Sequence, residues 1–169
     1  MDPMRVLRRT QFGNPILRAR ATPVPLAFLK TAAFRTLVKQ MFHTMHRAHG
    51  VGLAAPQVGK SIRLAVIRGG GVRRVIVNPK ILSKSPQKAL DWEGCLSFPD
   101  GRGKVPRART VKVRFTDVHG RVRTETHRGY AARIFQHEID HLDGKVYVDR
   151  MTDMRTLMTH KEFVKRVVR

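Results

Sequence analysis

Two stretches of the chain repeat apolar residues at the three- and four-residue spacing of an amphipathic helix. The first spans residues 27–49 and stops before Gly50, and the second spans residues 130–142 and is followed by Gly144. Because glycine often follows the last turn of a helix, both patterns predict helices that end there. A weaker apolar stripe predicts a terminal helix over residues 151–169. The apolar positions of the first helix are Phe34, Leu37, Val38, Met41, Phe42 and Met45.

Shorter patterns along the chain predict strands. Residues 62–68 and 73–82 are rich in apolar side chains and flank the glycines at 69–71, which predicts a hairpin. Apolar and basic side chains alternate over residues 109–117, as in a strand with one buried face, and residues 121–127 predict a more exposed neighbour. Four further features are predicted: an irregular arm over 5–25, an interruption or edge position at Asn78-Pro79, a surface loop over 83–89, and a short strand over 146–148.

The predicted elements define an α+β fold, in which mainly antiparallel strands pack around one central helix at 130–142. The 169 residues are enough for one domain with its own core, and no linker or repeat divides them. We therefore expect a single domain over residues 1–169 that carries a helical tail at 151–169. No apolar run approaches the length of a membrane span, so we expect no membrane partner.

The balance of charge is unusual, because 34 lysines and arginines face 12 acidic residues, for a net charge of +22. Such an excess favours polyanionic partners such as nucleic acid, although a strongly cationic solvated surface would give the same number. Residues 1–9 lack the apolar segment of a secretory signal, and their arginines are also compatible with an organellar presequence. We expect a cytoplasmic monomer, or an organellar protein if the host is a eukaryote.

The central helix carries the pattern H-E-x-x-H, in which His137 and His141 are four residues apart and Glu138 lies beside the first. On a helix this spacing points both imidazoles from one face toward a common metal ion, with the carboxylate close to a water held there. A surface helix with scattered polar residues is the alternative. The histidines of the first helix lack a neighbouring carboxylate or cysteine and are interpreted as polar-face residues: His43, His46 and His49.

Three segments follow one another in a fixed order: GVGLAAPQ at residues 50–57, EGCLS at 93–97 and QHEIDHLDG at 136–144. Together they resemble the three sequence motifs of the peptide deformylase family, without a gap or a substitution, and the similarity runs from about residue 6 to 151. The resemblance implies the mixed α+β fold of that family. It also implies removal of the formyl group from formyl-methionine at the N-terminus of newly synthesised proteins.

The resemblance also assigns roles to individual residues. Glu138 would be the general acid and base, and Gln57 with the backbone N–H of Leu96 would stabilise the oxyanion. The backbone of Gly50, Val51 and Gly52 would bind the peptide as a strand. Ile134 would line the methionine pocket. The metal ligands would be Cys95, His137 and His141, which are the single cysteine and the two helical histidines. Independently of the resemblance, Arg102, seven residues after Cys95, is a candidate contact to the peptide backbone.

Two imidazoles and one thiolate leave a fourth tetrahedral position for water, which is typical of a catalytic metal site. The metal would lower the pKa of that water to about 7, so that hydroxide can attack the formyl carbon. The ligand types suit several divalent ions. The family resemblance points to iron(II) as the native ion, with zinc or nickel able to replace it.

Several neighbouring residues are expected to support the site. Glu93 and Asp140 lie beside the ligands in sequence, and Arg107 would pair with one of them. Arg133 would lie near the methionine pocket, and Trp92 would be a packing residue. The basic residues of the tail are compatible with docking on ribosomal RNA, or equally with a solvated helix: Lys161, Lys165, Arg166 and Arg169.

Three other functional classes compete with this interpretation. A general metallopeptidase or amidase would need a third ligand from another segment, whereas Cys95 is already available. A non-enzymatic RNA-binding protein with a structural metal would need a fourth protein ligand, and no second cysteine exists to provide it. A hydrolase with Cys95 as nucleophile would leave the paired histidines at i and i+4 unexplained.

Overall fold

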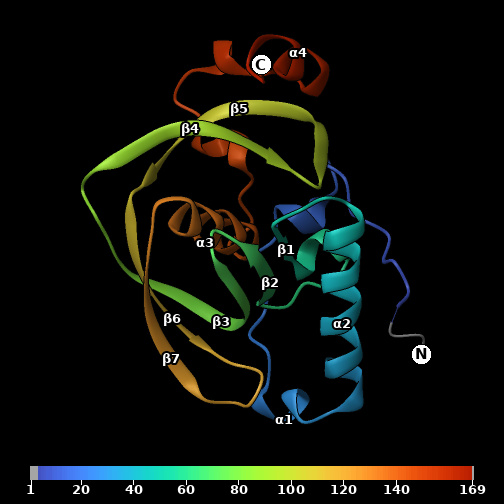
Figure 1. The fold of residues 1–169 in the computed structure, drawn as a ribbon. Helices are drawn as coiled ribbons and strands as arrows, with labels where there is room; N and C mark the ends of the chain where they lie inside the picture. Colours follow the sequence, from blue (N-terminus) through green and yellow to red (C-terminus); the bar gives the residue numbers. More distant parts are fainter. Residues whose placement is uncertain (1–3, 169) are drawn as a thin grey trace.

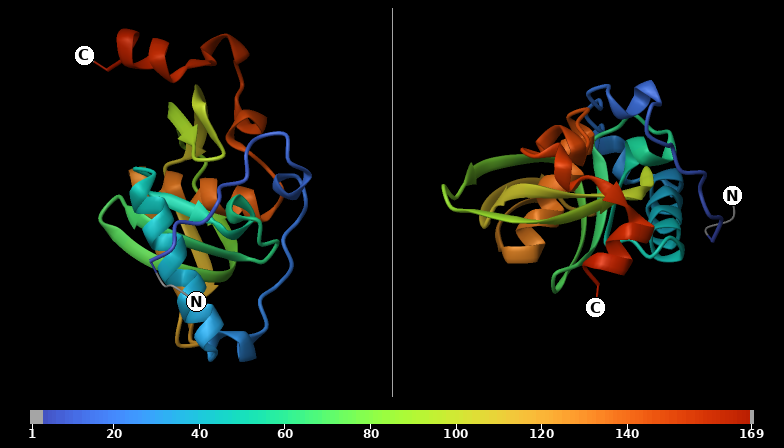
Figure 2. Two further views of the ribbon diagram at one scale, coloured as in Figure 1. Left: turned by 90° about the vertical axis from the view of Figure 1, so that its right-hand side faces the viewer. Right: turned by 90° about the horizontal axis from the view of Figure 1, so that it is seen from above.

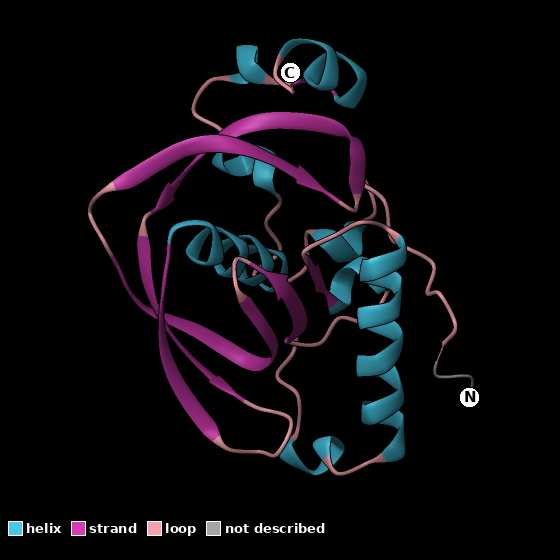
Figure 3. Cartoon of the chain, in the orientation of Figure 1, coloured by secondary structure: helices cyan, strands magenta, loops and turns pink. Residues whose placement is uncertain are grey.

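The computed structural model describes residues 4–168 and contains two β-sheets with helix α3 (Gly129–Leu142) between them (Figure 1, Figure 3). The strand order is β1-β2-β3-β6-β7 in the first sheet and β4-β5-β8 in the second. Neighbouring strands are antiparallel in both sheets. The predicted α+β fold, with mainly antiparallel strands around a central helix, is confirmed.

The first sheet contains the predicted hairpin, whose turn is formed by Gly70 and Gly71 with φ angles of +61° and +77°. Only glycine adopts such left-handed angles without strain, which explains the glycine run between two apolar strands. The turn lets the whole of the first strand, residues 64–69, pair with residues 72–77 of the second. The strands of this sheet are β1 (Gly52–Ala54), β2 (Leu64–Gly69), β3 (Val72–Lys84), β6 (Thr110–Thr116) and β7 (Val122–Arg128).

β3 continues through Asn78-Pro79 without a break, so the predicted interruption is limited to its pairing with β6, and β3 lies in the interior of the sheet and not at its edge. Proline cannot donate a hydrogen bond to a neighbouring strand, and a register shift between Val77 and Lys80 accommodates it. The side-chain amide of Asn78 bonds to the N–H and C=O of Val24, at 2.8 and 2.9 Å. These bonds fasten the N-terminal arm to the sheet.

The surface loop predicted at 83–89 is shorter than expected, because only residues 85–87 lie outside strands. Strand β3 continues to Lys84 and the next strand begins at Lys88, because residues that looked polar enough for a loop pair along the exposed faces of two strands. The glycine- and proline-rich segment after residue 97 is also a strand. The members of the second sheet are β4 (Lys88–Cys95), β5 (Phe98–Ala108) and β8 (Met158–Thr159).

The predicted helix at 27–49 is divided into α1 (Leu26–Leu29) and α2 (Ala32–Arg47). Thr31 ends the continuity, because its extended backbone and side-chain oxygen cap α2 by accepting the N–H of Phe34 at 3.1 Å. The inner face of α2 buries Phe34, Met41 and Met45 against the first sheet. Two 3₁₀ turns, η1 (Pro15–Leu17) and η2 (Ala55–Val58), complete this half of the chain.

The C-terminal predictions need correction. Residues 146–148 do not form a strand: a 3₁₀ turn, η3 (Tyr147–Arg150), occupies this place, because the Asp149 carboxylate accepts the N–H of Val146 at 2.9 Å. The predicted helix at 151–169 is likewise broken within the described residues. Its parts are η4 (Met154–Thr156), the short strand β8 and α4 (His160–Arg166).

The N-terminal arm is irregular, as predicted, and crosses two of the three sequence motifs. The N–H of Thr10 donates to the carbonyl of Gln57 at 2.8 Å, and that of Phe12 donates to Ser97 at 2.7 Å. The Phe12 ring stacks on Phe98 with centroids 5.2 Å apart. The arm therefore ties the 50–57 and 93–97 segments together. Among residues 4–168, no helix is long and apolar enough to cross a membrane.

Candidate metal centre

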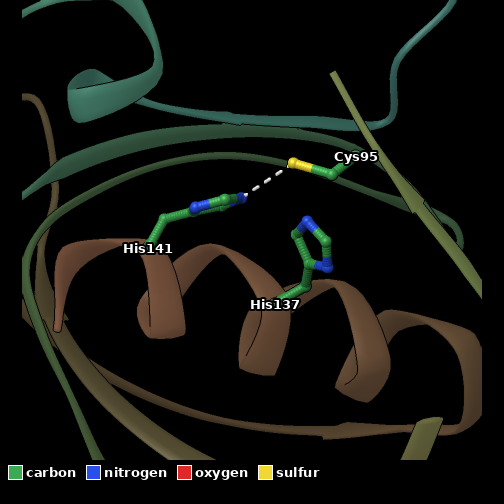
Figure 4. Close-up of side chains that lie close together, drawn as sticks. All are labelled: Cys95, His137 and His141. Atoms are coloured by element: carbon green, nitrogen blue, oxygen red, sulfur yellow. Dashed lines mark hydrogen bonds between the residues drawn. The ribbon is translucent and has the colours of Figure 1, made fainter. Parts of the chain in front are cut away.

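Helix α3 and strand β4 bring three metal-ligating side chains together (Figure 4). His137 and His141 lie one turn apart on α3 and point toward Cys95 at the end of β4. The thiol sulfur lies 3.2 Å from Nε2 of His141, and the ligating atoms of the three residues all lie within 4.8 Å of one another. The described residues contain no other group of this kind. The ligand set expected from the family resemblance thus converges in space.

The chemistry of these side chains fits a divalent cation. Burial raises the pKa of the Cys95 thiol, but the imidazoles of His141 and His137 outweigh burial and hold that pKa well below its ordinary value. A buried thiolate beside two imidazole nitrogens is a donor set that zinc and similar divalent ions accept. The three groups would hold such an ion with one coordination position left for another ligand.

The orientation of His137 is set by an acidic neighbour. Nδ1 of His137 lies 2.9 Å from the Glu93 carboxylate, which leaves Nε2 of the same ring facing Cys95. Glu93 receives two bonds from Arg107, at 2.9 and 3.0 Å, and one from Arg133, at 2.7 Å. Burial raises the pKa of Glu93, but hydrogen bonds from His137 and Arg107 outweigh burial and lower it.

Arg107 joins both acidic neighbours of the ligands, as the sequence predicted for one of them. Its guanidinium is 4% exposed and also bonds to Asp140 at 2.5 Å. Asp140 bonds in turn to Arg150, at 2.6 and 3.0 Å. No motif or spacing indicated Arg150, which reaches Asp140 from the η3 turn. Arg133 lines the pocket, as expected, and is also a buried member of the same network.

Glu138 is the buried carboxylate of the site. The residue is 3% exposed, and Oε2 has no hydrogen-bond partner within residues 4–168. Burial raises the pKa of this carboxyl from 4.5 to about 7, against the opposing influence of His137 and His141. Gly52 on β1 faces it so closely that a Cβ there would collide with the carboxylate. The glycine is therefore required for Glu138 to occupy this position.

Gln57 presents its amide nitrogen to the site in a defined orientation. Its Oε1 accepts the N–H of Ala54 at 2.8 Å, and its Nε2 lies 3.3 Å from both the Cys95 sulfur and the Ser97 hydroxyl. The Leu96 side chain packs beside Gly50, where a Cβ would approach Leu96 to 2.6 Å. The first two motifs are therefore in contact next to the metal ligands.

A pocket of about 590 Å³ opens over these groups. All of the residues that the resemblance assigned to the site line it, except His141, which lies deeper. Trp92 was expected to be a packing residue. It packs against Phe163 of α4, and it also lines the pocket. Sequence reasoning missed four further lining residues, which lie outside the three motifs: His49 directly before the first motif, Tyr130 on α3, and Arg9 and His160 near the two ends of the chain.

Together the fold, the pocket and the Cys/His/His group define a metal-dependent hydrolase. Comparison with known proteins agrees. The model of the polypeptide deformylase family matches residues 6–156. The peptide deformylase of Thermotoga neapolitana is 42% identical over 153 residues, covering 90% of this chain and 92% of its own. Peptide deformylase 2 of Nostoc is 37% identical, over 90% of each chain.

Solved structures give the same answer. The peptide deformylase of Thermotoga maritima superimposes with a TM-score of 0.83 and 39% identity, over 88% of this chain and 99% of its own. A class I type b peptide deformylase from Acinetobacter baumannii, bound to Met-Ala-Ser, superimposes with a TM-score of 0.84 and 39% identity. The match again covers 88% of this chain and 99% of its own. This chain therefore belongs to the polypeptide deformylase family, whose members are metal-dependent enzymes.

Proposed function

We propose that this protein removes the formyl group from the N-terminal formyl-methionine of newly synthesised proteins. The convergence of Cys95, His137 and His141 beside the buried carboxylate of Glu138, at the floor of a pocket, carries this proposal. We further propose that residues 1–169 act as one catalytic domain. The protein would work as a cytoplasmic monomer, and its charge of +22 would favour a position near ribosomal RNA.

The three ligands would hold one divalent ion, iron(II) in the native enzyme, with zinc or nickel as substitutes. When bound, the ion would supply Lewis-acid activation of the reacting water and carbonyl. Glu93 keeps His137 aimed at this position, and Arg107 with Arg133 keeps Glu93 ionised. The surrounding residues therefore hold the ligands ready before the ion binds.

Glu138 would act as the general base and then as the general acid. Burial raises the pKa of this carboxyl to about 7 in the metal-free protein, and a carboxyl raised toward neutrality can accept the proton of the attacking water and return it to the departing amine. Its unpaired Oε2 supports this role, since no other described residue competes for the proton. Burial of Glu138 limits exchange of this proton with bulk water.

The negative oxygen that develops on the formyl carbon would be met by two donors. Nε2 of Gln57 is held toward the site by the bond that its Oε1 accepts from Ala54. The backbone N–H of Leu96 would be the second donor. Preorganised donors of this kind each contribute about 10²–10³ in kcat.

The peptide would bind as an added strand between two sheet edges. Strand β1, which continues the Gly50–Gly52 segment, is an edge of the first sheet, and β4 is an edge of the second. Both carry residues that line the pocket, and unpaired strand edges are suited to bind an extended peptide. The side chain of methionine would lie against Ile134, and Arg102 would contact the peptide backbone.

The test is deformylation of formyl-Met-Ala-Ser by protein purified without oxygen, with and without a chelator. We expect release of formate that stops on chelation and returns with iron(II), nickel or cobalt. Acetyl-Met-Ala-Ser and unblocked Met-Ala-Ser are the matched substrates that separate deformylation from general peptidase or amidase activity. Absence of formate release from a folded, metal-loaded protein would reject the proposal.

A further inference from the structure

The C-terminal segment from Met158 to Arg166 lies beyond residues 6–156, which match the family, and yet it forms part of the pocket. Strand β8 pairs with β5, placing Met158 opposite Arg102 and Thr159 opposite Gly101. The chain then turns into α4, whose first residue, His160, lines the pocket. Figures 1 and 2 place α4 beside β4 and β5, on the side away from the first sheet.

An aromatic contact holds this segment in place. The rings of Trp92 and Phe163 meet edge to face, with centroids 5.2 Å apart, and the His160 ring stacks on Phe163 at 6.4 Å. The ammonium group of Lys104 lies 5.3 Å from the centre of the Trp92 ring. Such contacts restrain α4 against β4. These contacts place His160, which is exposed, at the pocket wall.

The polar groups at this end of the pocket lack an acidic partner. Arg102 packs on Gly94, and its Nη1 donates to the carbonyls of Pro99 and Gly101, at 2.9 and 2.7 Å. No carboxylate among residues 4–168 pairs with Arg102, with Arg9, which also lines the pocket, or with His160.

The acidic residues nearby do not cancel this charge. Glu93 is fully engaged by Arg107, Arg133 and His137. Asp91 lies on the same strand, β4, but does not line the pocket, and its carboxylate accepts the N–H of Trp92 at 2.8 Å. Asp100 is an exposed neighbour of Arg102 on β5 that does not line the pocket, and Glu162 of α4 pairs with Arg166. The charged side chains that line this end of the pocket are therefore mainly cationic, in keeping with the charge of the whole chain.

We infer that Arg102 and His160 form a subsite that selects formyl-methionyl peptides with an aspartate or glutamate among the residues after methionine. The inference rests on the proposed function. The Arg102 guanidinium has further N–H donors besides Nη1, so it can bind a substrate carboxylate in addition to the proposed contact with the peptide backbone. His160 adds a ring nitrogen from the C-terminal segment. His160 is thus a specificity-determining residue from outside the family-matched region.

The experiment compares kcat/KM for formyl-Met tetrapeptides that carry aspartate, lysine or alanine at the second, third or fourth position in turn. For at least one position we expect kcat/KM for the aspartate peptide to exceed that for the lysine peptide by about three- to fivefold, as for a partly exposed ion pair. His160→Ala should reduce this ratio, whereas His160→Gln, which keeps a side-chain donor, should retain part of it. A ratio of one at every position would overturn the inference.

Lys161→Ala is the matched control, because this neighbouring cation of α4 does not line the pocket. The control should keep the wild-type ratio, and an equal loss in both variants would assign the preference to overall charge and reject the subsite. Thermal unfolding of each variant shows whether α4 remains in place. Failure of the proposed function is distinguishable, since no formyl peptide, the alanine series included, would then be hydrolysed.

Discussion

Gly52 and Glu138 are packed against each other, with no room between them for a side-chain carbon. The first belongs to β1 and the second to α3, so the contact joins the edge of the first sheet to the helix that carries the metal ligands. The glycine is explained by this approach of a carboxylate, because its own backbone angles are not left-handed. One atom added at Gly52 would displace the group that we propose transfers the proton.

Gly52→Ala should therefore lower kcat by about 10² or more, in the range expected for losing a general acid–base group. Steady-state deformylation of formyl-Met-Ala-Ser measures the effect. Gly103→Ala is the control, since its Cβ would collide with the flexible end of Met151, at 2.6 Å, and make an ordinary contact with the Tyr147 ring, at 3.5 Å. That variant should lose some stability but keep its kcat, and a Gly52→Ala enzyme with normal kcat would contradict the role of Glu138.

Glu138→Gln should abolish turnover and stabilise the metal-free protein at neutral and higher pH. The folded pKa of about 7 exceeds the ordinary 4.5, so the protonated carboxyl is favoured in the folded state and its contribution is lost as pH rises toward 7. Glutamine avoids this loss. The difference in unfolding free energy should grow from near zero below pH 4.5 to on the order of 3 kcal/mol at pH 8. Denaturant titrations across this range test it, and a constant difference would contradict it.

Asp140→Asn should destabilise the protein by about 3–5 kcal/mol, because it leaves the buried guanidinium of Arg107 with one fewer anion and deprives Arg150 of its partner. Glu162→Gln removes an exposed partner of Arg166 and should cost less than about 1 kcal/mol. Denaturant unfolding of both variants at pH 7 makes the comparison. Equal effects would mean that the Asp140 network adds no stability.

The same network predicts that folding stability decreases at acidic pH. Burial raises the pKa of Asp140, but bonds from Arg150 and Arg107 outweigh burial and lower it below its ordinary 3.8. Its contribution is therefore fully present above about pH 4 and is lost as pH falls through the lowered value. Wild type and Asp140→Asn should approach equal stability in strong acid, as measured by unfolding between pH 2 and 7. A gap that stays constant would exclude this linkage.

Removal of the metal should lower the melting temperature of the wild type. A ligand that binds only the folded state stabilises it by an amount that grows with its free concentration relative to Kd. In Cys95→Ser or His141→Ala, chelation should change the melting temperature much less, because one ligand is already missing. Metal analysis should give one ion per wild-type chain. If chelation lowers the melting temperature of both variants as much as that of the wild type, the ion is bound elsewhere.

The sequence alone was sufficient for features that depend on neighbours within one element. The apolar spacing of 130–142 placed the central helix, and the four-residue step from His137 to His141 follows from helical geometry. The hairpin followed from glycines between two apolar runs. Three motifs in order identified the family resemblance, which the comparisons confirm.

Errors occurred where local signals compete. Thr31 capped a new helix inside a continuous apolar pattern, and Asp149 turned residues that looked like a strand into a 3₁₀ turn. In both places one side chain satisfies a backbone N–H and alters the local structure. Polar residues at 83–89 resembled a loop, although an exposed strand face is equally polar.

Only the tertiary structure decided which residues meet across long separations. Cys95 reaches the two histidines because β4 and α3 pack against each other, and Arg150 and His160 join the site through the C-terminal turns. The sequence by itself determined the central helix, the spacing of its ligands and the glycine turn, since each depends on backbone geometry over a few residues. Contacts between segments depend on how two sheets close around one helix, and no local pattern encodes that distance.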